Sequence, residues 1–287
     1  MDTSTTVVVI PCYNAYTTIQ DVVTDVKKFI ANVIVVDDGS QDQSAEFAKK
    51  SGATVISMNK NSGVGKATQT GVQFALENKK AKEIITLDAD AAHNPSDILS
   101  LLNLHRHSNS VLTIGNRWGN YDVHIPCQKW WANQFASALV NNIASTKIPD
   151  VACGFRVFSK ELAEQISNST MEKGFGFIYQ QIFLAKEIGD IEFAPIGVRY
   201  DANFLLSTKQ NELLHLIDIS RKYCTDTKLH DVLCKITEEA NLLRKICVNL
   251  TNYNNYLILY PLINQQSYLF QWQHPDFVTQ PSDFHEI

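Results

Sequence analysis

The sequence predicts an α/β protein with a mostly parallel sheet flanked by helices, followed by a C-terminal helical extension. Up to about residue 116, short runs rich in β-branched residues alternate with segments of helical periodicity, and such alternation gives right-handed βαβ crossovers. Three of the runs end abruptly in polar or acidic residues, which is typical of strands that are buried on both faces and open into loops. From about residue 201 onward the pattern is helical only.

The first half of the chain supplies the regular alternation of strands and helices. Apolar residues recur at helical spacing from Ile19 to Ile30, which predicts a helix after the first strand. Pro95 suits the first turn of a later helix, because proline is favoured at that position. The elements predicted here are, in chain order, strand 7–10, helix 15–30, strand 33–36, helix 43–50, strand 53–58, a helix from about 66 to 78, strand 84–87, a helix from Pro95 and strand 111–115.

After residue 116 the alternation breaks down. The elements predicted there are a helix at about 128–143, a mixed strand at 151–158, two further helices, a strand at 191–198, and helices at about 204–222, 228–248 and 255–264. We therefore predict a sheet domain over residues 1–200 and a helical extension over residues 201–287. The apolar stripes of the extension could pack on the sheet domain, form a dimer surface or touch a membrane peripherally.

Composition and charge narrow the compartment and the partners. The chain has 287 residues, of which 45% are hydrophobic and 19% charged, as is ordinary for a globular protein. Its formal net charge of −5 provides no basic field for nucleic acid. The six cysteines form no CxxC pair, which favours free thiols in a reducing compartment, and no apolar run approaches the ~20 residues that span a bilayer. We expect a cytoplasmic protein that binds no nucleic acid, with peripheral contact at the cytoplasmic membrane face left open.

Asp88 and Asp90 are two carboxylates that directly follow the predicted strand 84–87. The carboxyl ends of parallel strands face one crevice, and open α/β sheets bind ligands there. Carboxylates gathered in a crevice repel each other unless a cation lies among them, and oxygen ligands on a partly open site suit Mg²⁺ or Mn²⁺. Ala89 is small enough to let a ligand lie against the backbone. The alternative is a strand-end turn or helix cap without a ligand.

Two further motifs belong to the same predicted crevice. Asp37 and Asp38 follow the second strand, where one carboxylate could accept a hydrogen bond from a nucleobase N–H or a ribose hydroxyl. Gly63, Gly65 and Lys66 open a helix and could cradle a phosphate, since the free N–H groups of a helix N-terminus favour anions. The alternatives are a tight turn whose carboxylates only bond backbone amides, and a flexible glycine turn with a solvent-facing lysine.

Several motifs follow one another in a fixed order over residues 5–200. They are Val8-Val-Ile-Pro-Cys-Tyr-Asn14, Val35-Val-Asp-Asp-Gly-Ser-Gln-Asp42, Asn61 to Gly71, Asp88-Ala-Asp-Ala-Ala-His-Asn-Pro95, Ile114-Gly-Asn-Arg117, Asp150-Val-Ala-Cys-Gly-Phe-Arg156 and Gly174-Phe-Gly-Phe. This set resembles the inverting family 2 glycosyltransferases of GT-A (Rossmann-like) fold, in particular the branch of dolichol-phosphate mannose synthase and the polyprenyl-phosphate glycosyltransferases. The resemblance implies an enzyme of the hexosyltransferase type that takes a sugar from a UDP- or GDP-sugar donor.

On the donor side, the resemblance implies a nucleotide pocket and a metal site. Asp37, with Asp38, would read the base, and Asp88 would contact the donor sugar or the ribose. Asp90, with Asp88, would hold Mg²⁺ or Mn²⁺ on the diphosphate. The remaining donor residues would be Pro11, Tyr13, Asn14, Gly63, Gly65, Lys66 and Ala89.

On the acceptor side, the resemblance implies that Arg117 meets the acceptor phosphate, with Lys129 in place of a second arginine. Asp150 would shape this side and could serve as a catalytic base. The other acceptor residues would be Asn133, Gly154, Phe155, Arg156 and Gln180.

The chain departs from the family pattern at Ala15, Ala92, Asn133 and Gln180. Glutamine cannot take a proton, so a sugar-hydroxyl acceptor would need another base, such as Asp150. A phosphate acceptor needs none, because a second pKa near ~6 leaves it largely ionised at neutral pH. We therefore predict a polyprenyl-phosphate acceptor, with a hydroxyl of a cell-envelope glycan as the alternative. A non-catalytic nucleotide-sugar-binding protein is the third interpretation.

Overall fold

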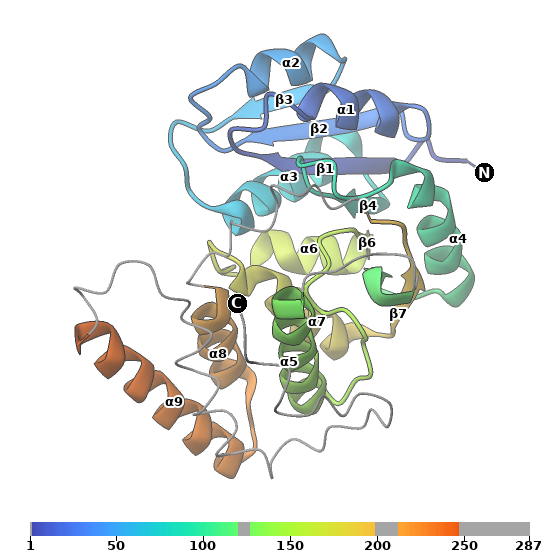
Figure 1. Cartoon of the computed structure of the whole chain (residues 1–287). Coiled ribbons are helices and arrows are strands. Elements are labelled where there is room, and N and C mark those ends of the chain that lie inside the picture. Colours follow the sequence, from blue (N-terminus) through green and yellow to red (C-terminus); the bar gives the residue numbers. More distant parts are fainter. Residues whose placement is uncertain (1, 120–126, 199–211, 247–287) are drawn as a thin grey trace. The chain divides into compact units, whose positions relative to one another are not determined.

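A computed structural model describes residues 2–119, 127–198 and 212–246 of the chain (Figure 1). The chain divides into two compact units, Met1–Thr237 and Glu238–Ile287. The first unit contains the sheet and all the helices that pack on it. None of the helices in the described ranges combines the length and the apolar character needed to cross a bilayer.

The sheet has seven strands within the described residues, in the order β3-β2-β1-β4-β6-β5-β7. Only β6 runs against its neighbours, while the other pairs are parallel, so the carboxyl ends of six strands share one edge. The strands are β1 (Thr6–Cys12), β2 (Asn32–Asp37), β3 (Thr54–Ser57), β4 (Glu83–Thr86), β5 (Leu112–Asn116), β6 (Arg156–Ser159) and β7 (Ile191–Pro195).

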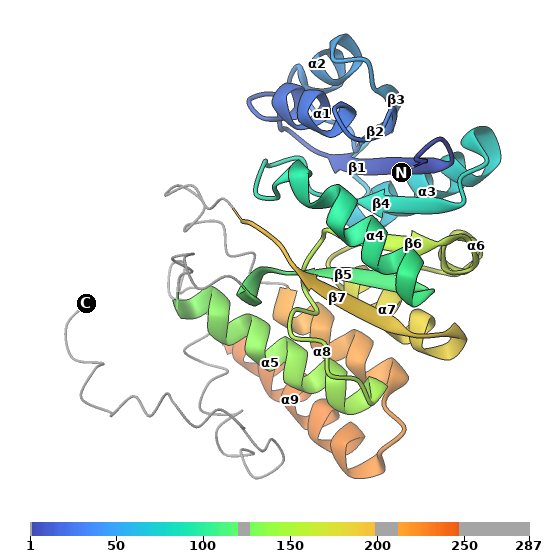
Figure 2. The same cartoon turned by 90° about the vertical axis from the view of Figure 1, so that its right-hand side faces the viewer.

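Helices cover both faces of this sheet (Figure 2). On one face α1 packs with α2 and lies next to the turn that leads into α4; on the other, α3 packs with α6, and α6 with α7. Further from the sheet, α8 contacts α5 and α7. The helices are α1 (Ile19–Lys27), α2 (Ser44–Lys50), α3 (Val64–Lys79), α4 (Ile98–Ser108), α5 (Cys127–Ala144), α6 (Lys160–Asn168), α7 (Gly176–Ile188), α8 (Glu212–Tyr223) and α9 (Thr227–Ile246).

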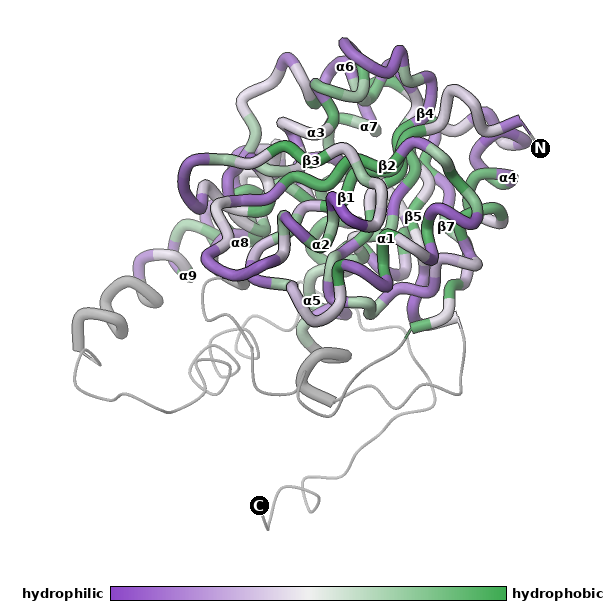
Figure 3. The backbone as a smooth tube through the Cα atoms, turned by 90° about the horizontal axis from the view of Figure 1, so that it is seen from above, coloured by the Kyte–Doolittle hydropathy of each residue, from purple (hydrophilic) through white to green (hydrophobic). Residues whose placement is uncertain are grey.

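The hydrophobic core follows the central strands (Figure 3). Val7 to Ile10 in β1 and Ile34 to Val36 in β2 are 0% exposed, as expected for strands covered on both faces. The predicted α/β class with a mostly parallel sheet is confirmed.

Among the predicted elements, three differ most clearly from the structure at their ends. The helix expected over 15–30 begins only at Ile19 and ends at Lys27. The strand expected over 151–158 begins at Arg156, because the Arg156 side chain bonds the carbonyls of Val151 and Cys153 and holds them in a loop. The strand expected over 191–198 ends at Pro195, followed by a single bridge at Val198.

The domain boundary predicted near Tyr200 falls in residues 199–211, outside the described residues, and stays a prediction. Helix α8 belongs to the same compact unit as the sheet. The helix predicted at 255–264 also lies outside the described residues, as does the remainder of the extension after residue 246.

Gly71 tests how closely α3 packs on the sheet. A Cβ built at Gly71 would meet the side chains of Val9 in β1 and Val36 in β2, the latter at 2.9 Å. We expect Gly71→Ala to lower the free energy of unfolding by roughly 1–3 kcal/mol through overpacking, despite the better helix propensity of alanine. Chemical denaturation measures this. Gln73→Ala on the exposed side of the same helix is the control, and an equally stable Gly71→Ala would contradict the packing.

Candidate functional site

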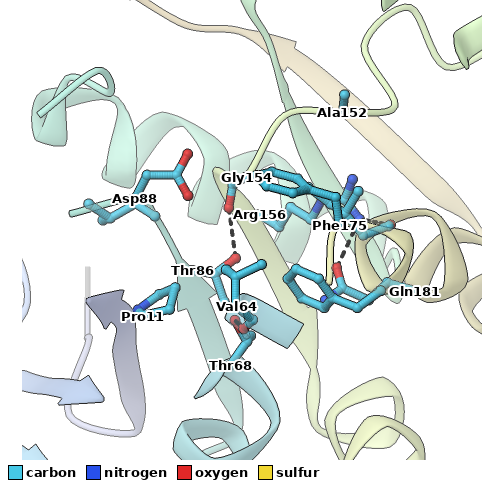
Figure 4. A pocket seen from close by; sticks show the side chains of 13 residues that line it. Pro11, Val64, Thr68, Thr86, Asp88, Ala152, Gly154, Arg156, Phe175 and Gln181 are labelled. Carbon is cyan, nitrogen blue, oxygen red and sulfur yellow. Dashed lines mark hydrogen bonds between the residues drawn. The ribbon is translucent and has the colours of Figure 1, made fainter. Parts of the chain in front are cut away.

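The candidate site lies where the carboxyl ends of β1, β2 and β4 meet the loop that precedes β6. Asp88 and Gly154 lie beside a small pocket that Arg156, Phe175 and Gln181 also line (Figure 4). The pocket has a volume of about 40 Å³, room for a few water molecules and far below the roughly 300–1,000 Å³ of small-molecule sites. A large ligand would therefore contact Asp88 from the open side of the crevice.

Asp88 is held on two sides. Its Oδ2 lies 3.0 Å from Nε2 of the buried His93, while 45% of the Asp88 side chain is exposed. On the other side, a Cβ at Gly154 would lie 2.7 Å from Asp88 Oδ1, so only glycine leaves room for the carboxylate. Desolvation raises the pKa of Asp88, but the hydrogen bond from His93 and nearby positive charges outweigh it and keep this pKa below its ordinary value.

Asp90 is exposed, and its Oδ1 accepts a hydrogen bond from the backbone N–H of Ala92 at 3.0 Å. Desolvation, followed by the charge of Asp88, raises the pKa of Asp90 above its ordinary value. Ala89 between them is buried, and its carbonyl accepts a hydrogen bond from Thr18 Oγ1 at 2.7 Å. The two carboxylates are thus close enough to repel each other, and a cation would relieve this repulsion.

The oxygen ligands of Asp88 and Asp90 fit a divalent ion that takes most of its other ligands from water and substrate. Among the described residues, no group of three or more His, Cys, Asp or Glu side chains could enclose a metal. Ala92 supplies no polar side chain next to the acidic pair. Asp88 and Asp90 offer carboxylate oxygens, which Mg²⁺ and Mn²⁺ prefer, and Mg²⁺ commonly keeps several waters and substrate phosphate oxygens.

Asp37 and Asp38 both bond backbone amides. Asp38 accepts hydrogen bonds at both oxygens, from the N–H groups of Ser62 at 2.7 Å and Gly63 at 2.8 Å. Asp37 accepts one at Oδ1, from the N–H of Ser40 at 3.2 Å. Asp38 therefore ties the loop before α3 to the end of β2, and within the described part of the chain Asp37 Oδ2 has no hydrogen-bond partner.

Pro11 lies near the end of β1, and Tyr13 and Asn14 lie on the loop that follows it. Pro11 lines the pocket, and Tyr13 is 47% exposed. Asn14 has a positive φ of 50°, its N–H donates to Ser40 Oγ, and its Oδ1 accepts from the N–H of Gln41. Asn14 therefore joins the loop after β1 to the loop after β2, which gives it a structural role beside its predicted one.

Gly63 and Gly65 pack against the segment before α7. The N–H of Gly65 donates to the carbonyl of Lys173 at 2.9 Å, and a Cβ at either glycine would collide with the backbone of residues 172 and 173. This contact accounts for both glycines without a phosphate. Lys66 is exposed and donates to Gln69 at 3.3 Å, so donor binding by these three residues stays a prediction.

Arg117, Asp150 and Asn133 form a buried network on the predicted acceptor side. Arg117 donates from Nε to Asp150 Oδ2 at 2.7 Å and from Nη2 to Oδ1 at 2.8 Å, and Asn133 Nδ2 donates to the same Oδ1 at 2.8 Å. Asp150 is 0% exposed; burial raises its pKa, but the Arg117 charge and these hydrogen bonds keep it below the ordinary value. Both Asp150 oxygens are thus occupied by Arg117 and Asn133, and a catalytic role for Asp150 stays a prediction.

Arg156 and Phe155 are buried beneath the predicted acceptor side. Arg156 is 1% exposed and donates to the carbonyls of Val151, Cys153 and Ile178 and to Gln181 Oε1, at 2.6–2.8 Å. Burial lowers the pKa of Arg156 to about 10. Phe155 is 0% exposed, whereas Arg156 also lines the small pocket. Both support the loop that carries Gly154, and their predicted contact with the acceptor stays a prediction.

Gln180 is 7% exposed. Its Oε1 accepts from the N–H of Glu172 at 2.9 Å, and its Nε2 donates to the carbonyl of Thr170 at 3.0 Å. Glutamine suits this position because it supplies both an acceptor and a donor. Lys129 lies in α5, in a stretch whose side chains are outside the described residues, so its predicted role is untouched by the geometry.

The sequence alone assigned no role to His93 or Trp118. His93 bonds Asp88, and its place five residues after Asp88, just before Asn94-Pro95, was the available signal. Trp118 donates from Nε1 to Asn133 at 3.2 Å, and its ring lies 5.5 Å from the Arg117 guanidinium. Only its position directly after Arg117 hinted at this.

Comparisons with known proteins agree with this geometry. The family described as Glycosyl transferase family 2 matches residues 7–167. An uncharacterised protein of Methanocaldococcus jannaschii is 34% identical over 71% of this chain and 93% of its own length. The UDP-N-acetylglucosamine–dolichyl-phosphate N-acetylglucosaminyltransferase of Methanococcus voltae is 26% identical over 67% of this chain and 86% of its own. Polyprenol monophosphomannose synthase of Mycolicibacterium smegmatis is 26% identical over 61% and 69% respectively.

A solved structure shares the fold. Glucosyl-3-phosphoglycerate synthase from Mycobacterium tuberculosis, crystallised with Mn²⁺, UDP and glucosyl-3-phosphoglycerate, superposes with a TM-score of 0.58 at 18% identity, covering 78% of this chain and 81% of that one. The predicted GT-A fold class is therefore confirmed.

The Asp150 network makes stability depend on pH in a defined direction. The pKa of Asp150 is lowered in the folded state. The ionised carboxylate therefore makes its full contribution to the free energy of unfolding above the ordinary aspartate pKa of ~3.9, and this contribution is lost as the pH falls below that value. We expect Asp150→Asn to lower the free energy of unfolding at neutral pH by roughly 1.5–3 kcal/mol, with a deficit that shrinks in acid. Denaturation at several pH values measures this. Asp25→Asn, at an exposed pair with Lys28, is the control, and a pH-independent deficit would contradict the network.

Proposed function

Because this chain belongs to glycosyl transferase family 2, we propose that it moves a sugar from a nucleoside-diphosphate sugar to a polyprenyl phosphate of the dolichyl type. The chain is a glycosyltransferase, as predicted, and the proposal concerns its donor, acceptor and metal. The observation that carries it is the acidic pair at the crevice: Asp88 fixed by His93 and Asp90 exposed beside it. The relatives that act on dolichyl or polyprenyl phosphate support the acceptor.

Asp88 and Asp90 would hold Mg²⁺ or Mn²⁺. When bound, the divalent ion would neutralise the negative charge that builds up on the departing nucleoside diphosphate. Asp90 would serve as the exposed ligand. Desolvation, followed by the charge of Asp88, raises its pKa, and a cation would relieve the repulsion between the two carboxylates. Asp88 keeps Oδ1 without a hydrogen-bond partner within the described residues, so this oxygen is available to the donor.

The reaction is a single in-line displacement at the anomeric carbon, with inversion. Arg117, fixed by the buried Asp150 carboxylate, would bind and orient the acceptor phosphate. That phosphate needs no base, because its second pKa near ~6 leaves it ionised at neutral pH. The protein side chains then only bind or orient the two substrates. Asp37 and Asp88 contact the donor, and Arg117 contacts the acceptor.

A hydroxyl acceptor is the second candidate, and the geometry disfavours it. Such an acceptor needs a base within hydrogen-bond reach. Gln180 cannot take a proton and is occupied by Thr170 and Glu172, while Asp150 is buried against Arg117. A lipid-phosphate acceptor also implies work at a membrane surface, where this protein would act peripherally from the cytoplasmic side.

For the donor base we propose uracil. Asp38 has both oxygens occupied by amides, and Asp37 has one, so Asp37 Oδ2 offers a single acceptor. Uracil presents a single ring N–H, at N3, which one oxygen satisfies. The Watson–Crick edge of guanine presents N1–H and an amino group side by side, and these two donors would need both oxygens of one carboxylate.

Asp90→Ala tests the metal-dependent donor site. We expect the variant to fold normally, to lose Mn²⁺-dependent binding of its UDP-sugar and to transfer sugar about 10²–10³-fold more slowly, as when one electrostatic contact to a leaving group is removed. Calorimetric titration and a transfer assay measure these. Asp21→Ala, at an exposed position on α1, serves as the control, and unchanged metal-dependent binding in Asp90→Ala would argue against the site.

Asp37→Asn tests the base. Its Oδ1 can still accept from Ser40, but Nδ2 replaces the oxygen that would accept uracil N3–H. We expect UDP binding to weaken roughly tenfold or more, the worth of a hydrogen bond to a charged group, and CDP binding to strengthen, because cytosine N3 is an acceptor. Titration of the wild type and of Asp37→Asn with UDP, GDP and CDP in the presence of Mn²⁺ measures these affinities. Wild-type preference for GDP would refute uracil without touching the transferase proposal, whereas binding of no nucleotide would refute both.

A further inference from the structure

We infer that His93 is a positioning residue, which fixes the Asp88 carboxylate for the donor through a hydrogen bond from Nε2–H. The inference rests on the proposed function for what Asp88 does, and on the structure for how His93 holds it. Nothing in the sequence motifs assigns His93 a role, and no described residue duplicates its contact with Asp88.

The contact has hydrogen-bond length, and its histidine side is shielded from water. Nε2 of His93 lies 3.0 Å from Asp88 Oδ2, and the His93 side chain is 2% exposed. Its ring packs against Phe155 with centroids 5.5 Å apart, tilted by 52°. Because Phe155 is itself fully buried, the imidazole packs against a side chain that is held in the core.

The other ring nitrogen identifies the tautomer. Nδ1 of His93 is one of two buried side-chain polar atoms without a hydrogen-bond partner in the described part of the chain. A proton on Nδ1 would be a buried donor without an acceptor, which costs about 1–3 kcal/mol. The proton therefore lies on Nε2, where the Asp88 carboxylate accepts it.

The backbone around His93 is tied down as well. His93 forms a β-bridge with Val198, and Asp97 Oδ2 accepts a hydrogen bond from the N–H of Gly197 at 2.8 Å. Asn94 Oδ1 accepts from the N–H of Ser96 at 3.2 Å. The turn that carries His93 is thus clamped between Asp88 and the segment after β7.

One oxygen of the Asp88 carboxylate is therefore held by His93, and the other is left open for the donor. His93 occupies Oδ2, and the missing side chain of Gly154 leaves space at Oδ1. A purely packing role would be better filled by phenylalanine, which would stack on Phe155 without leaving an unpartnered nitrogen in the core. The imidazole makes sense at this position only if its hydrogen bond to Asp88 matters.

Three substitutions in the full chain separate positioning from packing. His93→Phe keeps the ring and removes the donor. His93→Gln places an amide nitrogen near the position of Nε2, and His93→Asn places one near the position of Nδ1. For each variant, thermal unfolding, titration with UDP in Mn²⁺, and kcat and KM for the UDP-sugar that the wild type uses are measured.

We expect His93→Phe to melt at or above the wild-type temperature, while donor affinity or kcat falls about 10–100-fold, the usual cost of losing such a supporting hydrogen bond. His93→Gln should recover most of this loss and His93→Asn little of it. Wild-type donor affinity and kcat in His93→Phe would overturn the inference, as would equal losses in the Gln and Asn variants.

A second measurement decides the inference even if no donor binds. In histidine-labelled protein, ¹H–¹⁵N correlation through the ring identifies the tautomer of His93, assigned by its disappearance in His93→Gln. We expect an Nε2–H tautomer whose proton is shielded from exchange and becomes exchangeable in Asp88→Ala. An Nδ1–H tautomer, or a proton indifferent to Asp88→Ala, would overturn the inference, whereas failure of the wild type to bind any nucleotide would refute only the proposed function.

Discussion

The buried guanidinium of Arg156 is the constraint on which the site depends. It is 1% exposed and bonds three backbone carbonyls and Gln181, and so joins the loop before β6 to α7. The charge is costly to bury, as its lowered pKa of about 10 shows, and multiple hydrogen bonds offset this cost. Through this loop Arg156 places both halves of the site: Gly154 against the Asp88 carboxylate, and Asp150 against Arg117.

The donor and acceptor sides use charge in opposite ways. On the proposed acceptor side, the Asp150 carboxylate is buried and fully paired, so its charge fixes the Arg117 guanidinium. On the proposed donor side, desolvation, followed by the charge of Asp88, raises the pKa of Asp90, while the hydrogen bond from His93 helps to keep the pKa of Asp88 below its ordinary value. A cation would relieve the repulsion between Asp88 and Asp90, and in the proposed reaction Arg117 would meet the acceptor phosphate.

The sequence predicted the class of the fold and the place of the acidic pair, because both follow from short-range patterns. Buried runs such as Val33 to Val36 mark strands, and acidic residues at their ends mark the crevice.

Hydrogen bonds and contacts between residues far apart in the chain were not predictable from the sequence. Arg156 captures the carbonyls of Val151 and Cys153 and converts an apolar run into a loop. Gly63 and Gly65 face the backbone of residues 172–173, more than a hundred positions along the chain, so a local glycine motif suggested a phosphate where packing is sufficient. The pairing of Asp150 with Arg117, 33 positions earlier in the chain, was likewise not visible in the sequence.

The most direct test of this account is the product itself. Purified protein with Mn²⁺ and a panel of UDP-sugars and GDP-sugars would be offered dolichyl phosphate together with free glycans, and the products analysed by mass spectrometry and by NMR of the anomeric proton. The account predicts one glycosyl phosphate lipid, made from one UDP-sugar, with the anomeric configuration opposite to that of the donor. Sugar on a glycan hydroxyl instead, or a product that retains the donor configuration, would contradict it.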